Sequence, residues 1–302
     1  MTNPHPHPTE LSSLTPDEVL HGFERLGYVG DRALATSIFL AIRLHKPLLI
    51  EGHAGLGKTE AAKTLANMLA TELIRLQCYE GLDVSSAIYE WNYQKQLLAI
   101  RLQEGTQQTV EEKEKHIFGR EFLLERPLLR AIVAEDKPPV LLIDEVDRAD
   151  EAFEAFLLEL LSDFQISVPE MGTIRAKHRP HAILTSNRTR ELSDALKRRC
   201  LYHWIDYPSF EKEISIVRAR LPNVEAELSR QVVSYVQAVR GLDLAKPPGV
   251  AETLDCAQAL DSLGRRSLDG NSIEETIGCV TKSMEDSEKL RAAIGTVVAQ
   301  IR

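Results

Sequence analysis

The chain has 302 residues, which is enough for two domains or for one large domain with a smaller appendage. Hydrophobic residues make up 43% and charged residues 27%, a globular balance that excludes a disordered or fibrous chain. The 36 Lys and Arg residues are outnumbered by 45 Asp and Glu, and the net charge of −9 argues against a domain that grips nucleic acid along its length.

The amino-terminal part is predicted to be a tail followed by two helices. Residues 1–14 are rich in proline and hydroxyl side chains, which is typical of a flexible tail. A capping pattern at 15–18 starts the first helix, which ends near Gly27. The second helix begins after Gly30 and runs to about His45.

Five short apolar runs predict buried strands, because each is too brief for a buried helix. They are 47–51, 73–76, 140–144, 181–185 and 201–205. Helical patterns lie between them at 58–69, 122–134 and 151–161. Strands that alternate with helices predict right-handed βαβ units and a mainly parallel five-stranded sheet. The predicted fold class is therefore α/β.

The segments between these elements are less regular. A loop is expected around 82–93, and the charged run at 111–115 is typical of a solvated helix face. The apolar alternation over 166–174, with a glycine inside it, predicts a small hairpin.

The carboxyl-terminal third has no strand pattern. Residues 210–302 are predicted to be helical, with a break at 246–249, where two prolines precede a glycine. The expected organisation is a tail over 1–14, an α/β domain over 15–206 and a smaller all-α lid domain over 207–302.

Residues 52–59, GHAGLGKT, match the pattern G-x-x-x-x-G-K-[ST] between a predicted strand and a predicted helix. In such a loop, successive backbone N–H groups bind phosphate, and glycines permit the close approach and positive φ angles. We expect Lys58 to reach the β and γ phosphates of ATP, and the Thr59 hydroxyl to bind Mg²⁺. A chance match is the alternative, and the position between strand and helix argues against it. The predicted nucleotide-binding residues are Gly52, His53, Ala54, Gly55, Leu56, Gly57, Lys58, Thr59 and Glu60.

Two acidic residues follow the third strand. A phosphate loop needs a metal-holding carboxylate at the end of a neighbouring strand, and Asp144 is placed for that role. Glu145 can polarise a water for attack on the γ-phosphate. The alternative for the pair is a solvated loop or a helix cap.

Asn187 follows the fourth strand and can hydrogen-bond the attacking water or the γ-phosphate, although such an Asn alone is usually a turn residue.

Two adjacent arginines precede the fifth strand. A planar guanidinium suits the charge spread over a transferring phosphate, and a neighbouring subunit could present one to its partner's γ-phosphate. Arg199 is the first choice because it lies nearest the strand, and Arg198 is the second. A solvated basic turn is the alternative.

The cysteines and the amino-terminal residues indicate in which cellular compartment the protein is expected. Cys78, Cys200, Cys256 and Cys279 form no CxxC pair and have no accompanying histidine cluster, which disfavours a disulfide scaffold or a zinc site. We therefore expect a reducing, cytoplasmic setting. The start of the chain does not match a secretory signal, and the sequence holds no apolar run of 18 residues, so direct membrane insertion is not expected.

The segments GHAGLGKT, VLLIDEVDRAD, ILTSN and LKRRC, in this order and before a helical lid, resemble the AAA+ ATPases. Within that superfamily, DEVDRADEAFEAFLLELL resembles the MoxR branch. The segments LLIEGHAGLGKTE, LQCYEGLDVSSAIYEWNYQKQLL and ETLDCAQAL look like the MoxR-type ATPase encoded with molybdenum-containing carbon monoxide dehydrogenase and related hydroxylases.

The resemblance implies an ATP-hydrolysing homo-oligomer, commonly a hexameric ring, that acts in maturation of a metalloenzyme client beside a partner with a von Willebrand factor A domain. It also implies that Tyr28 and Val29 lie near the adenine. One departure is the start of a lid helix over 247–253, where such proteins often carry an arginine and this chain has none.

Two other functions are weighed against this remodelling ATPase. A nucleic-acid motor or loader of the same superfamily is the first alternative, and the acidic balance argues against it. A regulatory switch that binds nucleotide without turnover is the second, and the acid pair with its arginines argues against it.

The aromatic residues Tyr89, Trp91 and Tyr93 have two interpretations, since they either push on a client protein or pack their own domain.

Overall fold

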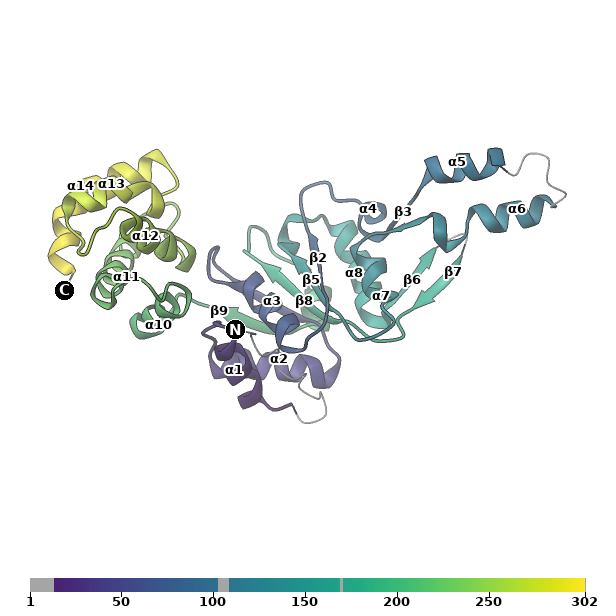
Figure 1. Cartoon of the computed structure of the whole chain (residues 1–302), viewed down its shortest axis with the longest axis horizontal. Coiled ribbons are helices and arrows are strands. Elements are labelled where there is room, and N and C mark those ends of the chain that lie inside the picture. Colours follow the sequence, from purple (N-terminus) through teal and green to yellow (C-terminus); the bar gives the residue numbers. More distant parts are fainter. Residues whose placement is uncertain (1–13, 103–108, 169–170, 302) are drawn as a thin grey trace. The chain divides into compact units, whose positions relative to one another are not determined.

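The computed structural model (Figure 1) describes residues 14–102, 109–168 and 171–301. These residues divide into two compact units. The first unit comprises Leu14 and Thr15 with residues 36–51 and 65–203. The second unit comprises residues 16–35, 52–64 and 204–301. The tail predicted over 1–14 lies outside the described residues, apart from Leu14.

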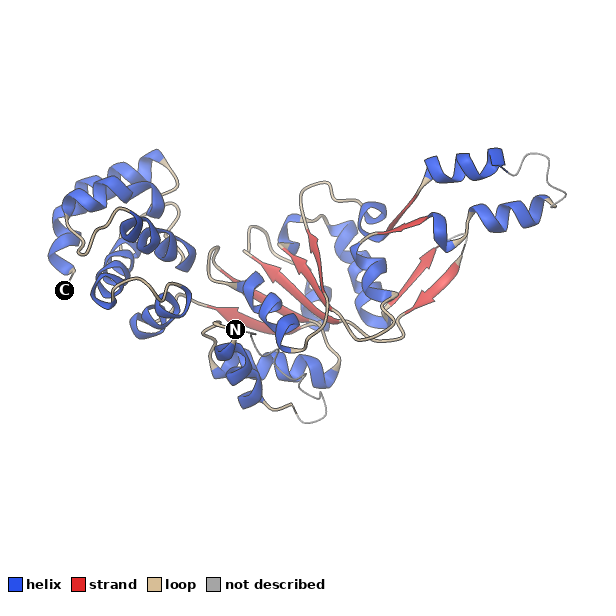
Figure 2. Ribbon diagram, in the orientation of Figure 1, coloured by secondary structure: helices blue, strands red, loops and turns tan. Residues whose placement is uncertain are grey.

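The structure contains the five-stranded sheet that the sequence predicts (Figure 2). Its strands, in spatial order, are β2 Leu73–Gln77, β5 Val140–Asp144, β8 His181–Ser186, β1 Leu48–Gly52 and β9 Leu201–Ile205. β2 pairs with β5, β5 with β8 and β8 with β1, all parallel. Every residue of β1 and of β5 is buried, which explains why both begin with a run of three or more apolar residues.

Helices alternate with these strands along the chain. They are α1 Pro16–Arg25, α2 Arg32–Leu44, α3 Lys58–Met68, α7 Pro127–Ile132, α8 Glu151–Asp163 and α9 Asp194–Arg199, together with the short turn η2 Val146–Arg148. Side chains of β2, β5, α7 and α8 share one hydrophobic core in the first unit. Asp150 caps α8 by accepting a hydrogen bond from the Phe153 N–H, which fixes where that helix begins after the acid pair.

The segment between β2 and β5 differs from the prediction. The loop expected around 82–93 is wrong, because this stretch forms a short helix and a strand. The elements are α4 Val84–Ile88, β3 Tyr89–Trp91, α5 Tyr93–Leu102, α6 Val110–Ile117, η1 Arg120–Phe122 and β4 Leu123–Glu125. α5 and α6 extend from β3 and β4 away from the five-stranded sheet (Figure 1).

The helix predicted over 122–134 is also wrong in its first half. Residues 123–125 pair antiparallel with β3, where Trp91 lies opposite Leu123. Only Pro127–Ile132 is helical, because a proline at the first helical position keeps the preceding Arg126 extended. The hairpin predicted over 166–174 is confirmed by β6 Gln165–Val168 and β7 Gly172–Arg175, which pair antiparallel.

The aromatic residues of β3 mainly pack their own unit. The Trp91 side chain is buried in the core and contacts the Tyr89 and Phe118 rings edge to face, with centroids 6.1 and 5.4 Å apart. Tyr93, in contrast, is exposed at the start of α5. The packing interpretation is therefore confirmed for Trp91 and Tyr89.

The second unit contains the helices of the carboxyl-terminal region. They are α10 Phe210–Arg220, α11 Ala226–Arg240, α12 Val250–Ser262, α13 Gly270–Val280 and α14 Met284–Gln300. Apolar side chains from all five form one core, and the buried Tyr235 ring belongs to it. The predicted helical region is confirmed, and its predicted break at 246–249 lies between α11 and α12.

Candidate functional site

The carboxyl ends of β5 and β8 bring together the polar residues of the first unit. In parallel sheets these ends share one edge, where ligands of α/β folds usually bind. Ile143 of β5 lies opposite Leu184 of β8, so the next residues, Asp144 and Thr185, are neighbours. The Thr185 hydroxyl donates to Asp144 Oδ1 at 2.5 Å and accepts the Glu145 backbone N–H at 2.9 Å. Thr185 thus orients both acidic residues, a role that the sequence pattern does not reveal.

The second carboxylate oxygen of Asp144 faces a cation on β2. Arg75 donates to Asp144 Oδ2 from Nε at 3.0 Å and from Nη2 at 2.6 Å. Asp144 is only 2% exposed, so the carboxylate is fixed at a buried strand end by two charged or polar partners. Arg75 is a further residue of the candidate site that sequence analysis missed.

Glu145 leaves the sheet in an unusual backbone conformation. Its φ of 54° lies in the left-handed region, which is uncommon for a residue with a side chain and is often found at functional sites. The Glu145 carboxylate is partly exposed and pairs with Arg148 Nε at 2.8 Å. The turn therefore directs an accessible carboxylate outward while the backbone N–H stays fixed by Thr185.

Asn187 and the two arginines lie in the same unit as the acid pair. Asn187 directly follows β8 and is half-buried. Arg198 and Arg199 occupy the last turn of α9, and both side chains are exposed. An arginine that contacts a nucleotide bound by a neighbouring copy must be exposed to solvent in the single chain, as both are. The choice between Arg198 and Arg199 stays a prediction.

The phosphate loop belongs to the second unit and has the backbone that its glycines predict. Gly55 and Gly57 have φ angles of 75° and 84°, so a residue with a side chain would be strained at either position. The Lys58 ammonium, only 6% exposed, donates to the carbonyl oxygens of Gly52 at 2.7 Å and His53 at 2.6 Å. The lysine therefore lies folded over its own loop.

The first turn of α12 contacts this loop directly. The Ala251 N–H donates to the Gly55 carbonyl oxygen at 3.1 Å. Gly249, the residue before α12, approaches so closely that an added Cβ would lie 2.7 Å from the Ala54 carbonyl oxygen. The lid helix thus meets the loop at the place where the sequence lacks the arginine.

We expect Gly249→Ala to lower the free energy of unfolding by about 1–3 kcal/mol, because the loop backbone at Ala54 and Gly55 leaves no room for the methyl group. Urea denaturation would measure it. Gly278→Ala is the matched control, since nothing lies within 4 Å of its added Cβ and helical alanine is favoured over glycine by about 0.5–1 kcal/mol. Equal stability of the two variants would contradict the close approach.

An arginine near the loop comes instead from the end of α11. Arg240 forms two hydrogen bonds with the buried Glu213 carboxylate, at 2.7 and 2.6 Å, and one with the Pro248 carbonyl oxygen at 2.7 Å. Its guanidinium lies 4.9 Å from the Tyr207 ring centroid, and that ring stacks on the loop residue His53 at 5.0 Å. Sequence analysis missed this stack because its members lie far apart along the chain.

Tyr28 lies against the same loop. Its ring is 3.7 Å from the position of a Cβ at Gly57 and meets Phe23 edge to face at 5.2 Å. Burial, then the nearby Asp31 and Glu60 carboxylates, raise the pKa of the Tyr28 phenol, so it stays neutral. Burial works against the Glu60 charge, but Arg220, bonded to Glu60 at 2.6 Å, holds the pKa of Glu60 below its usual range. The adenine contact of Tyr28 and Val29 stays a prediction.

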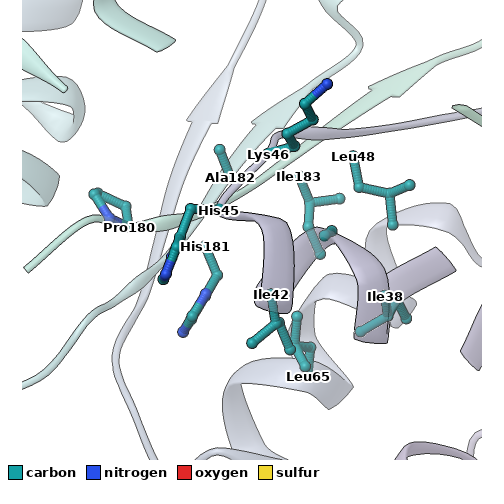
Figure 3. Close-up of a pocket in the computed structure, with 11 residues that line it drawn as sticks. Ile38, Ile42, His45, Lys46, Leu48, Leu65, Pro180, His181, Ala182 and Ile183 are labelled. Carbon is teal, nitrogen blue, oxygen red and sulfur yellow. The ribbon is translucent and has the colours of Figure 1, made fainter. Parts of the chain in front are cut away.

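A small hollow lies at the opposite, amino-terminal edge of the sheet (Figure 3). Leu48 of β1 and Ile183 of β8 line it with Ile38 and Ile42 of α2. Burial, and then the charge of His45, lower the pKa of His181 in its wall to about 4, so this imidazole is neutral at neutral pH. The hollow is thus separate from the strand ends that carry Asp144 and Asn187.

Three of the cysteines are deeply buried. Burial raises the pKa of the Cys78, Cys200 and Cys256 thiols to about 12, which leaves them protonated and unreactive. No group of three or more His, Cys, Asp or Glu residues that could hold a metal occurs in the part of the chain that the structure describes. Over residues 14–102, 109–168 and 171–301, no helix has the length and apolar character needed to cross a bilayer.

A family profile described as "AAA domain (dynein-related subfamily)" matches residues 47–200, just over half of the chain. No curated protein matches the sequence. The chain is similar to the RuvB Holliday junction branch migration motor of Thermotoga maritima, with 17% identity, a TM-score of 0.47 and coverage of 82% of this chain and 67% of that one.

A second similar structure is described as a "putative ATPase" of Cytophaga hutchinsonii. Its identity is 16% and its TM-score 0.43, and the match covers 95% of this chain and 92% of that one. TM-scores below 0.5 and identities below 25% carry no inference about activity, so only the family match bears on function.

Proposed function

The chain belongs to the AAA domain family of the dynein-related subfamily, and from this premise we propose that it couples ATP hydrolysis to the remodelling of a protein client. An AAA domain implies nucleotide binding and ATPase activity. The observation that carries the proposal is the Thr185 hydroxyl, which holds Asp144 and the Glu145 backbone together at the end of the central strands. A protein that binds nucleotide without hydrolysing it has no need of a second acidic residue, Glu145, whose backbone is fixed at this strand end.

The chain's own residues divide the chemistry among them. Lys58 and the glycine-rich loop would bind the phosphates, and Thr59 with Asp144 would hold Mg²⁺, since hydroxyl and carboxylate oxygens suit this ion. When bound, Mg²⁺ neutralises charge on the β and γ phosphates. Glu145 takes a proton from the attacking water, and the Asn187 amide hydrogen-bonds that water or the γ-phosphate.

We further propose a ring of identical subunits, which is typical of AAA+ proteins. Arg199, or Arg198 beside it, would then reach the γ-phosphate bound by the neighbouring copy. Support comes from the exposure of both guanidinium-bearing side chains at the end of α9. Hexameric assembly is the expectation that the MoxR resemblance adds.

The finer proposal is that the protein is a MoxR-type ATPase that matures a molybdenum hydroxylase with the help of a partner carrying a von Willebrand factor A domain. It rests on the sequence segments around the phosphate loop, the β2–β3 connection and α12. Motion of the lid helices on ATP turnover would supply the work on the client.

Trapping the client tests this proposal. We expect Glu145→Gln, loaded with Mg·ATP, to retain such a partner or hydroxylase during purification, and Lys58→Ala to retain neither. Quantitative mass spectrometry of the two samples makes the comparison. ATPase activity that rises with added DNA and falls steeply with salt would instead support a nucleic-acid motor and overturn the proposal.

A further inference from the structure

Asp147, three residues after Asp144, lies buried beneath the segment that carries Asn187. Its side chain is 2% exposed. Asp147 Oδ1 accepts the Asn187 backbone N–H at 3.2 Å. Asp147 Oδ2 accepts the Thr189 backbone N–H at 2.8 Å and the Thr189 hydroxyl at 2.7 Å. Both carboxylate oxygens of Asp147 therefore accept hydrogen bonds from the segment 187–189.

A second buried carboxylate holds the same segment from the other side. Glu51, at 4% exposure, accepts the Ser186 hydroxyl hydrogen at 3.0 Å. The Ser186 oxygen in turn accepts the Arg188 N–H at 3.1 Å. Arg188 has a φ of 57°, a left-handed conformation that persists where surrounding contacts fix it. The backbone on each side of Asn187 is thus anchored.

Asp147 also belongs to the turn that follows Glu145. This turn, η2, is anchored by Val146, which is fully buried, and begins at the left-handed Glu145. One carboxylate therefore connects the backbone that carries the proposed base to the backbone that carries the proposed water-binding amide. Charge-assisted hydrogen bonds of this kind are about twice as strong as neutral ones, which makes the connection stiff.

We propose that Asp147 is a positioning residue that sets the separation between Glu145 and the Asn187 side chain. The inference rests on the proposed ATPase function and adds a residue to it. In this proposal Asp147 acts through the segment 187–189 and not on the nucleotide itself.

Asp147→Asn tests the proposal, because asparagine has the size of aspartate but replaces one carboxylate oxygen with an NH₂ group. That NH₂ group would face a donor, either the Asn187 N–H or the Thr189 N–H and hydroxyl. We expect kcat to fall about 10²-fold, the effect of displacing a catalytic group by roughly 1 Å, while the Kd for Mg·ATP stays unchanged. Asp286→Asn is the matched control, since Asp286 is a buried aspartate that accepts the Ala245 and Lys246 N–H groups. It should lose similar stability and keep its kcat.

The double variant makes the test specific. If Asp147 acts through Asn187, adding Asp147→Asn to Asn187→Ala should cause no further loss of kcat. The proposal would be overturned if the kcat of the double variant fell by the product of the two single losses, or if Asp147→Asn alone kept its full kcat. Full turnover by Asn187→Ala alone would instead refute the proposed role of Asn187, which separates the two failures.

Thr189 gives an independent readout if Asp147→Asn does not fold. Thr189→Val removes only the hydroxyl that donates to Asp147, and Thr189→Ser keeps it. We expect the valine variant to lose kcat with an unchanged Kd and the serine variant to restore it. Equal kcat values for both variants would contradict the positioning role.

Discussion

Glu145→Gln should bind Mg·ATP normally and turn it over at least 10²-fold more slowly than the unmodified chain. Glutamine matches glutamate in shape but cannot take a proton from water. The left-handed backbone of Glu145 and its hydrogen bond to the Thr185 hydroxyl involve only main-chain atoms of Glu145, so the substitution leaves both intact. Binding and hydrolysis are therefore expected to separate.

Steady-state phosphate release and equilibrium nucleotide binding would measure the two properties. Glu151→Gln is the matched control, because Glu151 is an exposed glutamate in the first turn of α8 and should leave the rate unchanged. Undiminished turnover by Glu145→Gln would show that another group activates the water.

Lys58→Ala should weaken Mg·ATP binding by about 10–10²-fold or more. Each hydrogen bond from a charged donor to phosphate contributes about 1.5–3 kcal/mol, and the ammonium is the charge of the loop that would meet the phosphates. In the present structure that ammonium is held by the carbonyl oxygens of Gly52 and His53, so it lies beside the phosphate-binding backbone.

Isothermal titration of Mg·ATP into each variant would give the affinities. Lys63→Ala is the control, since Lys63 lies on the same helix, is half exposed and pairs with Glu60 at 3.5 Å. A Kd for Lys58→Ala equal to that of the control would contradict the assignment of the loop. Urea denaturation of both variants would exclude a loss of folding as the cause.

Much of the fold could be predicted because its information is local in sequence. The strands β1 and β5 begin with apolar runs, and the loop after β1 is recognised by glycines at fixed spacing before a lysine. The order of strands and helices then determines a parallel sheet. Asp144 could be placed at a strand end for the same reason.

The missed features depend on contacts between distant residues. β3 has three residues, which is too short for a periodic pattern, and it exists because Trp91 pairs opposite Leu123. Thr185 and Asp144 are 41 positions apart, and only the register of β5 and β8 brings them together. No spacing rule within a single segment could reveal the role of Thr185, Asp147 or Arg75.

The contact between Ala251 and Gly55 joins two main-chain groups and carries no formal charge. Dissolved ions screen the interactions of exposed charged groups, and they have little effect on a hydrogen bond between neutral amides. A lid that senses the loop by this route would keep its response over a wide range of ionic strength. It would also tolerate varied side chains at position 251, because only the peptide N–H takes part.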